Sequence, residues 1–303
     1  MFRLPFRRMP SGKRARQQRQ AAAVTAPPPV RSKGIGGARA RQASPRALAI
    51  TGGVVLLAVI AIVLGVVLSK GGSSGSNVVT KHDLAGLPAV GSQTWPGALQ
   101  GAGEAKDLFK GIPQKGLVLG SPQAPIEMEM FIDVQCPVFQ NYEAVNLPTI
   151  VRKYIRTGKV QLHLQPWAFL GGPGSQSFSG RYGVIGAGAQ NKAFEYAKVL
   201  YDNQGTEESG WLNGQEMAQI AASVTGLNLE QWRKDTNSPH AQSVTAAVDK
   251  LATKSKVFGT PTIFVGPPGG PLHNVQSAGE IAANAAPTLQ DTLQGIEQQL
   301  SRS

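Results

Sequence analysis

The chain has 303 residues, of which 41% are hydrophobic, and this suits one sizeable globular domain together with additional segments. Its formal net charge is +12, but residues 1–70 hold 13 of the 30 Lys and Arg and none of the 18 Asp and Glu. The rest of the chain carries 17 basic and 18 acidic side chains, a net charge of −1. Because a nucleic-acid-binding domain carries its positive charge on the folded part, we expect no nucleic-acid partner.

The first 46 residues form a basic segment rich in Arg, Gln, Ala, Gly and Pro, with almost no aliphatic run. Such a segment cannot bury enough apolar surface to offset its ordering entropy, so we predict a disordered tail at 1–46. Its basic charge is interpreted as a topology signal. An adhesive role toward anionic lipid or a partner is the alternative.

An uncharged apolar run follows at residues 47–68. At ~1.5 Å rise per residue it spans ~33 Å as a helix, enough for a bilayer core of ~30 Å. A cleaved signal peptide is disfavoured, since the charged region and the apolar core are both long and no small-x-small cleavage site follows. We predict an uncleaved transmembrane helix at 47–69, with the N-terminus cytoplasmic because the basic residues precede it. The C-terminal part is then expected on the extracytoplasmic side of the cell membrane.

Residues 70–115 are rich in Gly, Ser, Ala and Pro and show little periodicity. They open with a Gly/Ser run, a composition typical of flexible linkers. We therefore predict an extracytoplasmic linker over 70–115, followed by one folded domain over 116–303.

The domain alternates between strand and helix signals. Period-2 alternation predicts strands at 125–134 and 160–164, and a β-branched and aromatic run predicts another at 262–265. Helical spacing follows the first strand, where Pro148 is expected to kink the helix. A capping pattern at Thr288 begins a last helix. The order of elements predicts an α/β domain with a helical insertion at about 174–256.

Cys136 stands where the first strand ends and a helix begins. A helix N-terminus favours a negative charge, and a thiol placed there ionises more readily than a free cysteine. The alternative is a buried structural cysteine. Asp133, three residues earlier, is interpreted either as a proton relay beneath the thiol or as a hydrogen-bonded strand residue. A second feature is the pair Thr260-Pro261, which precedes the last predicted strand and suggests a tight junction.

Cys136 is the only cysteine of the chain, so no internal disulfide can form. The four histidines have no ligand spacing with it, and a structural zinc or iron–sulfur site would lack its ligands. We expect no metal and no cofactor. The histidines are His82, His163, His240 and His273.

Several stretches, in this order, resemble the DsbA-like thioredoxin-fold family. They are residues 119–125 and 131–137 around the first strand, 147–148 and 154–160 in the first helix and second strand, 209–212 in the insertion, and 259–262 at the proline loop. The resemblance covers 116–303 and implies a thioredoxin-like fold with the helical insertion typical of this family. It also implies thiol–disulfide oxidoreductase activity on protein or peptide substrates that carry thiols or disulfides.

The same resemblance implies that Cys136 is the nucleophile. It places substrate contacts at Thr260 and Pro261, where a bound peptide would add a strand, and at Gln135 and Pro137 on either side of the cysteine. The family pattern is C-x-x-C, whereas Phe139 stands at the position of the resolving cysteine.

Three functions stay open because the second sulfur is absent. The first is a monothiol enzyme, in which a small-molecule thiol, a redox partner protein or the substrate itself resolves the mixed disulfide. The second is a non-catalytic, chaperone-like binding module that uses the groove beside Pro261. The third is a disulfide-linked complex with a partner through Cys136. Phe139 is interpreted either as an apolar addition to the groove or as a packed core residue.

Overall fold

The structure, a computed structural model, describes residues 78–283 and 285–302. The predicted basic tail, the transmembrane segment and the first residues of the predicted linker lie outside these residues. Within the described ranges, no helix is both long and apolar enough to cross a membrane.

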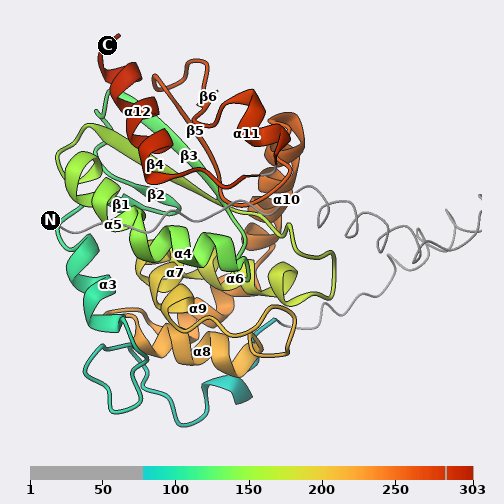
Figure 1. Cartoon of the computed structure of the whole chain (residues 1–303). Helices are drawn as coiled ribbons and strands as arrows, with labels where there is room; N and C mark the ends of the chain where they lie inside the picture. The colour runs from blue at the N-terminus through green and yellow to red at the C-terminus, as the bar shows by residue number, and fades with distance from the viewer. Residues whose placement is uncertain (1–77, 284, 303) are drawn as a thin grey trace, which may run out of the picture. The chain divides into compact units, whose positions relative to one another are not determined.

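A mixed sheet of six strands forms the centre of the described domain, in the order β1-β2-β4-β3-β5-β6 (Figure 1). β3 and β4 are parallel, with Ile126 opposite Val160 and Ile132 opposite Pro166, while the other neighbouring strands are antiparallel. The strands are β1 (Gln114–Lys115), β2 (Val118–Leu119), β3 (Ile126–Ile132), β4 (Val160–Pro166), β5 (Thr262–Gly266) and β6 (His273–Asn274). The predicted α/β class is therefore correct.

β3 lies between β4 and β5 near the centre of the sheet, and five of its seven residues are buried. The alternation seen in the sequence sorts its side chains onto two faces. Met128 and Met130 are fully buried in the main core, and Phe131 packs on the other face against Val257 and Phe264. The buried strand gives the residues after it a rigid starting point.

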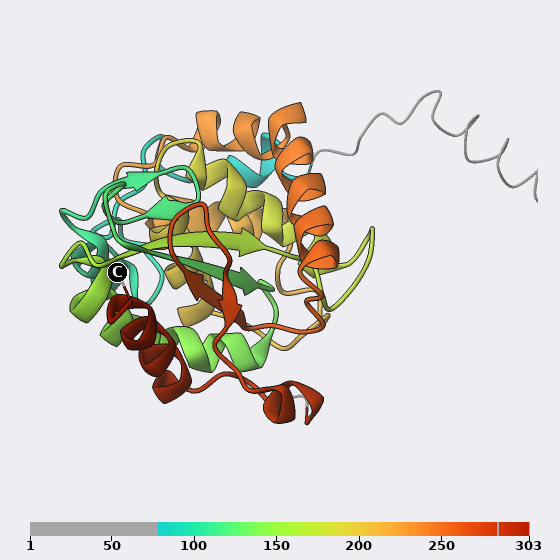
Figure 2. The ribbon, with the colours of Figure 1, turned by 90° about the horizontal axis from the view of Figure 1, so that it is seen from above.

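Helices cover both faces of the sheet. α4 (Pro137–Val145), α5 (Leu147–Ile150) and α12 (Leu289–Leu300) lie on one side of the strands, and α10 (Pro239–Lys254) lies on the other (Figure 2). The predicted break near Pro148 is present, since α4 ends at Val145 and a π-helical turn, Val151–Ile155, follows α5.

The chain between β4 and β5 folds as the predicted helical insertion. Its helices are α6 (Gln176–Gly188), α7 (Ala193–Asp202), α8 (Gly214–Ser223), α9 (Leu229–Thr236) and α10. Trp232 is fully buried at its centre, where the indole N–H donates to the Gly183 carbonyl at 2.9 Å. A buried indole with a satisfied N–H is a strong anchor for helix packing.

Residues 78–115 are more ordered than the predicted linker. They contain a short 3₁₀ helix (His82–Leu84) and α3 (Ala102–Phe109), whose apolar face is buried. Phe109 packs on Phe194 of α7 at a ring distance of 5.9 Å, and the Arg156 guanidinium donates to the Leu108 and Lys110 carbonyls at the end of α3. α3 was not predicted, because small Ala and Gly residues make up much of this short helix and leave little hydrophobic periodicity in its sequence.

Candidate functional site

The candidate site begins at the end of β3. A tight turn follows Ile132, and the Cys136 N–H donates to the Asp133 carbonyl at 3.0 Å. Cys136 is the N-cap residue of α4, and Pro137 occupies the first helical turn, where its missing N–H costs nothing. The thiol therefore stands at the positive end of a nine-residue helix, as the sequence predicted.

The Cys136 sulfur faces the loop that precedes β5. Its thiol donates to the Thr260 carbonyl at 3.2 Å, and the Thr260–Pro261 peptide bond is cis. Cys136 and the proline loop are 124 residues apart in sequence, so the fold unites the two predicted motifs. The Cys136 residue is 4% exposed, which leaves the sulfur at the bottom of a pocket rather than on the surface.

This pocket has a volume of about 310 Å³, and Pro137, Thr260 and Pro261 line it together with Cys136. Four large apolar side chains that line this pocket are exposed to water, which is typical of an interaction site. They come from four separate segments: Val138, Phe169, Phe258 and Ile281. We call them the apolar rim. A second cavity of similar volume lies between α3 and α7, but no cysteine lines it.

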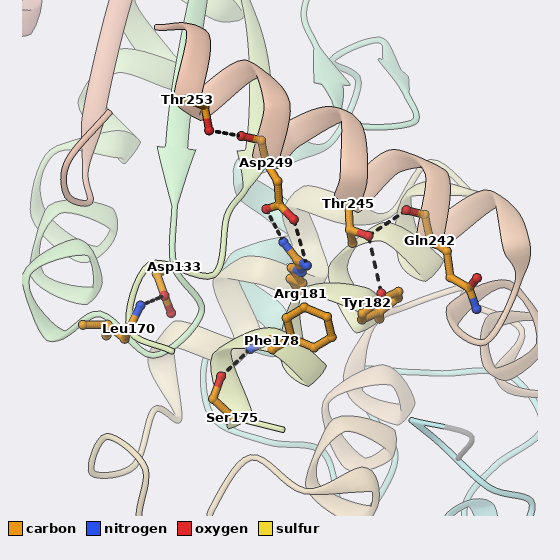
Figure 3. Close-up of polar contacts among 10 residues, drawn as sticks. All are labelled: Asp133, Leu170, Ser175, Phe178, Arg181, Tyr182, Gln242, Thr245, Asp249 and Thr253. Carbon is orange, nitrogen blue, oxygen red and sulfur yellow. Dashed lines mark hydrogen bonds and ion pairs between the residues drawn. The ribbon is translucent and has the colours of Figure 1, made fainter. Parts of the chain in front are cut away.

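Asp133 is buried beneath the turn and accepts three hydrogen bonds. Its carboxylate receives the Gln135 N–H at 2.9 Å, the Ser177 hydroxyl at 2.6 Å and the Leu170 N–H at 2.7 Å, the last drawn in Figure 3. The carboxylate is therefore committed to holding the turn and two neighbouring segments. The structure favours the hydrogen-bonded role over the proton relay.

Gln135 does not line the pocket. Its side chain is fully buried and points toward the insertion, where its amide contacts Ser177 and Glu208. The predicted substrate contact at Gln135 is corrected because the turn directs its buried amide toward Ser177 and Glu208, and it does not line the pocket.

Phe139 is also buried, with 1% of its surface exposed. Its ring lies 4.8 Å from that of Tyr201 and 6.2 Å from that of Tyr142. Of the two interpretations in the sequence analysis, the packed core residue is the one observed. The apolar contribution to the groove comes from Val138, the preceding residue.

A buried charged cluster beneath α4 was not predicted. Glu143 and Lys198 are each 2% exposed and lie 3.7 Å apart, and Asp202 lies 3.0 Å from the same ammonium group. Burial raises the pKa of Glu143 to about 8, although the charge of Lys198 acts against the rise. Cys136, Phe139 and Glu143 follow helical spacing, so the sequence did contain a signal that Glu143 faces the core.

Within the insertion, an ion pair joins α6 to α10. The Arg181 guanidinium is 2% exposed and pairs with Asp249 at 2.6 Å, while it stacks 4.5 Å from the Phe178 ring (Figure 3). In the ranges that the structure covers, no cluster of His, Cys, Asp and Glu side chains is arranged to hold a metal ion.

Comparisons with known proteins place this geometry in context. The profile of the thioredoxin family matches residues 113–268. Two curated relatives, each called probable disulfide bond formation protein D, come from Bacillus cereus and Bacillus anthracis. The first is 27% identical over 156 residues and the second 26% over 148 residues, and each match covers 48% of this chain and 68% of the relative. The crystal structure of oxidised BdbD from Bacillus subtilis has a TM-score of 0.50 at 18% identity, covering 63% of this chain and 97% of that one.

Proposed function

The chain belongs to the thioredoxin family as a DsbA-like thiol–disulfide oxidoreductase homologue, and from this premise we propose that it catalyses thiol–disulfide exchange with Cys136 as its single reactive thiol. The observation that carries the proposal is the position of that sulfur. It stands at the N-terminus of α4, opposite Pro261, in a pocket large enough for a substrate side chain.

The proposed reaction has two steps. The Cys136 thiolate attacks one sulfur of a substrate disulfide, the S–S bond breaks, and the other substrate sulfur leaves as a thiolate that takes up a proton. A second thiol then attacks the mixed disulfide and releases Cys136. If that thiol belongs to the substrate, the disulfides are rearranged without net oxidation. If it is a small-molecule or partner thiol, the substrate retains a thiol and the incoming thiol becomes part of a new disulfide.

The monothiol route follows from the presence of Phe139 at the position of the second cysteine. In a C-x-x-C site the second cysteine releases the mixed disulfide, and here the equivalent side chain is a buried phenyl ring. The chain has no other cysteine to replace it. The resolving thiol must therefore come from outside the chain.

We propose that the substrate is an extended polypeptide that pairs with the loop before β5. In the described part of the chain, no group accepts a hydrogen bond from the Thr260 N–H, so a bound strand can use it. The thiol occupies the Thr260 carbonyl in this structure, and forming the thiolate would free that carbonyl for the peptide. The apolar rim would contact side chains on either side of the substrate cysteine.

The predicted location remains part of the proposal. A helix over residues 47–68 would hold the domain on the extracytoplasmic side of the cell membrane, where disulfides persist. Extraction of native membranes with alkaline carbonate tests the anchor, because an integral protein stays in the pellet. Recovery in the supernatant would contradict it.

A non-catalytic binding module is the second candidate, and the apolar rim favours it. Such a module would use the rim and the Thr260 loop without forming a covalent bond. The two functions differ in their need for sulfur: exchange requires Cys136, and binding does not.

The experiment compares the wild-type protein with Cys136→Ser on a substrate that has scrambled disulfides, with a small thiol present. The wild type is expected to restore native disulfides, and the variant to lose all of this activity while its far-UV spectrum stays unchanged. A variant that remains active would remove Cys136 from the mechanism. An inactive wild type that binds the unfolded substrate as tightly as the variant would establish the binding module instead.

A further inference from the structure

We propose that Glu208 is a positioning residue for Cys136 and acts through Gln135. The inference rests on the proposed function in one respect, namely that the Cys136 sulfur is the reacting atom. It assigns to the helical insertion a direct part in aiming the nucleophile.

Gln135 and Glu208 hold each other by two hydrogen bonds. The Glu208 backbone N–H donates to the Gln135 side-chain carbonyl at 3.0 Å, and the Gln135 amide N–H donates to the Glu208 carboxylate. The Gln135 amide also lies 3.3 Å from the Ser177 hydroxyl. Because Gln135 is fully buried, removing the Glu208 carboxylate takes one acceptor from its amide, which then keeps only the 3.3 Å contact with Ser177.

The Glu208 backbone adopts an unusual conformation. Its φ is +50°, in the left-handed region that non-glycine residues rarely adopt. Glu208 is exposed to solvent, yet in this conformation its N–H and its carboxylate both reach the buried Gln135 side chain. The carboxylate also accepts the Gln176 N–H at 3.1 Å, at the positive end of α6. A residue in a costly conformation persists where its surroundings fix it, and Glu208 has three such contacts.

The same segment of the insertion holds the turn at two more atoms. The Tyr201 hydroxyl donates to the Asp133 carbonyl at 3.0 Å, and the Gln204 side-chain amide donates to the Gln135 carbonyl at 2.6 Å. Tyr201, Gln204 and Glu208 thus hold the backbone immediately before Cys136, and Glu207 of the same segment lines the pocket. The direction of the sulfur toward Thr260 depends on this support as well as on β3.

The test is a double-mutant cycle on the reactivity of Cys136. Glu208→Ala, Gln135→Ala and the double variant are treated with iodoacetamide, which modifies the thiol without requiring exchange activity. Each single variant is expected to react about tenfold faster, equivalent to ~1.4 kcal/mol and near the lower limit of the usual range for a hydrogen bond to a charged group. The looser turn would free the 4% exposed residue from Thr260. The double variant should also be about tenfold faster, because the two side chains act as one unit.

The matched control is Glu230→Gln, which removes an exposed carboxylate from the first turn of α9 and should leave the rate unchanged. Glu208→Gln retains an acceptor and should give an intermediate rate, which guards against a misfolded alanine variant. Single variants that react at the wild-type rate, or a double variant that reacts about a hundredfold faster, would overturn the inference. In the Glu208→Ala and Gln135→Ala variants, the rate of exchange with a peptide disulfide should fall while the rate of alkylation rises. An absence of exchange in the wild type would refute the proposed function alone, because alkylation reports the thiol position independently.

Discussion

The two sides of α4 have opposite characters although they begin at adjacent residues. Val138 is 47% exposed at the apolar rim, whereas Phe139 is 1% exposed and packs between Tyr142 and Tyr201. The rim side retains what a thiol-exchange site needs: a sulfur, a proline loop and an apolar surface. The core side has an aromatic ring where the family pattern has its second sulfur. Phe139 therefore belongs to the packed core, while Cys136 and Val138 form the pocket side of α4.

The largest effect is expected when Phe139 and Val138 are truncated in separate variants. Phe139→Ala is expected to lower the free energy of unfolding by ~3–5 kcal/mol, because it leaves a cavity in a packed aromatic cluster. Val138→Ala should change it by no more than ~0.5 kcal/mol, as is usual for exposed positions. Denaturant unfolding measures both. Equal losses for the two variants would show that α4 does not separate a core side from a rim side.

Glu143 gives the core side a dependence on pH. Its pKa in the folded protein is raised to about 8 by burial, from 4.5, so the folded state binds the proton more tightly than the unfolded state. Stability should therefore be greatest near and below pH 4.5 as far as this group is concerned, and fall as the pH rises toward 8. The loss is on the order of a few kcal/mol.

Glu143→Gln should flatten this decline, since the amide cannot ionise, and the variant should exceed the wild type in stability at about pH 8. Thermal unfolding on both sides of that pH measures the difference. Glu104→Gln is the matched control, because it removes an exposed acid 3.7 Å from the same Lys198 ammonium. A decline that is equally steep in the Glu143→Gln variant would assign the pH dependence to another group.

The smallest expected effect lies on the rim side. Phe258 is 69% exposed beside the pocket, so Phe258→Ser should leave stability within ~0.5 kcal/mol of the wild type. Exchange with an apolar peptide disulfide should slow about tenfold, because one anchor of the substrate is lost. The rate with iodoacetamide should stay the same. A rate with the peptide that does not change would remove Phe258 from the substrate contacts.

Local patterns in the sequence predicted much of the architecture. The alternation in β3, the cap at Thr288 and the position of Cys136 before a helix depend on neighbouring residues, and all are present. The inward direction of Gln135 could not be predicted in this way. Its partner Glu208 is 73 residues away, and only the folded chain brings the two together. The buried pair of Glu143 and Lys198 was also not foreseen: helical spacing places Glu143 on the core face, but charged residues are rarely enclosed and its partner Lys198 lies on another helix.

The packing of α3 on α7 has a practical consequence for anyone who shortens this protein. Residues 102–109 supply the cover for Phe194, and Arg156 is bonded to the carbonyls at their end. A recombinant fragment that starts at residue 116, the domain boundary predicted from the sequence, would expose the apolar surface around Phe194. It would also leave the Arg156 guanidinium without these two carbonyl acceptors. Such a fragment should aggregate in solution, whereas a fragment that starts at residue 78 retains α3 and keeps this surface buried.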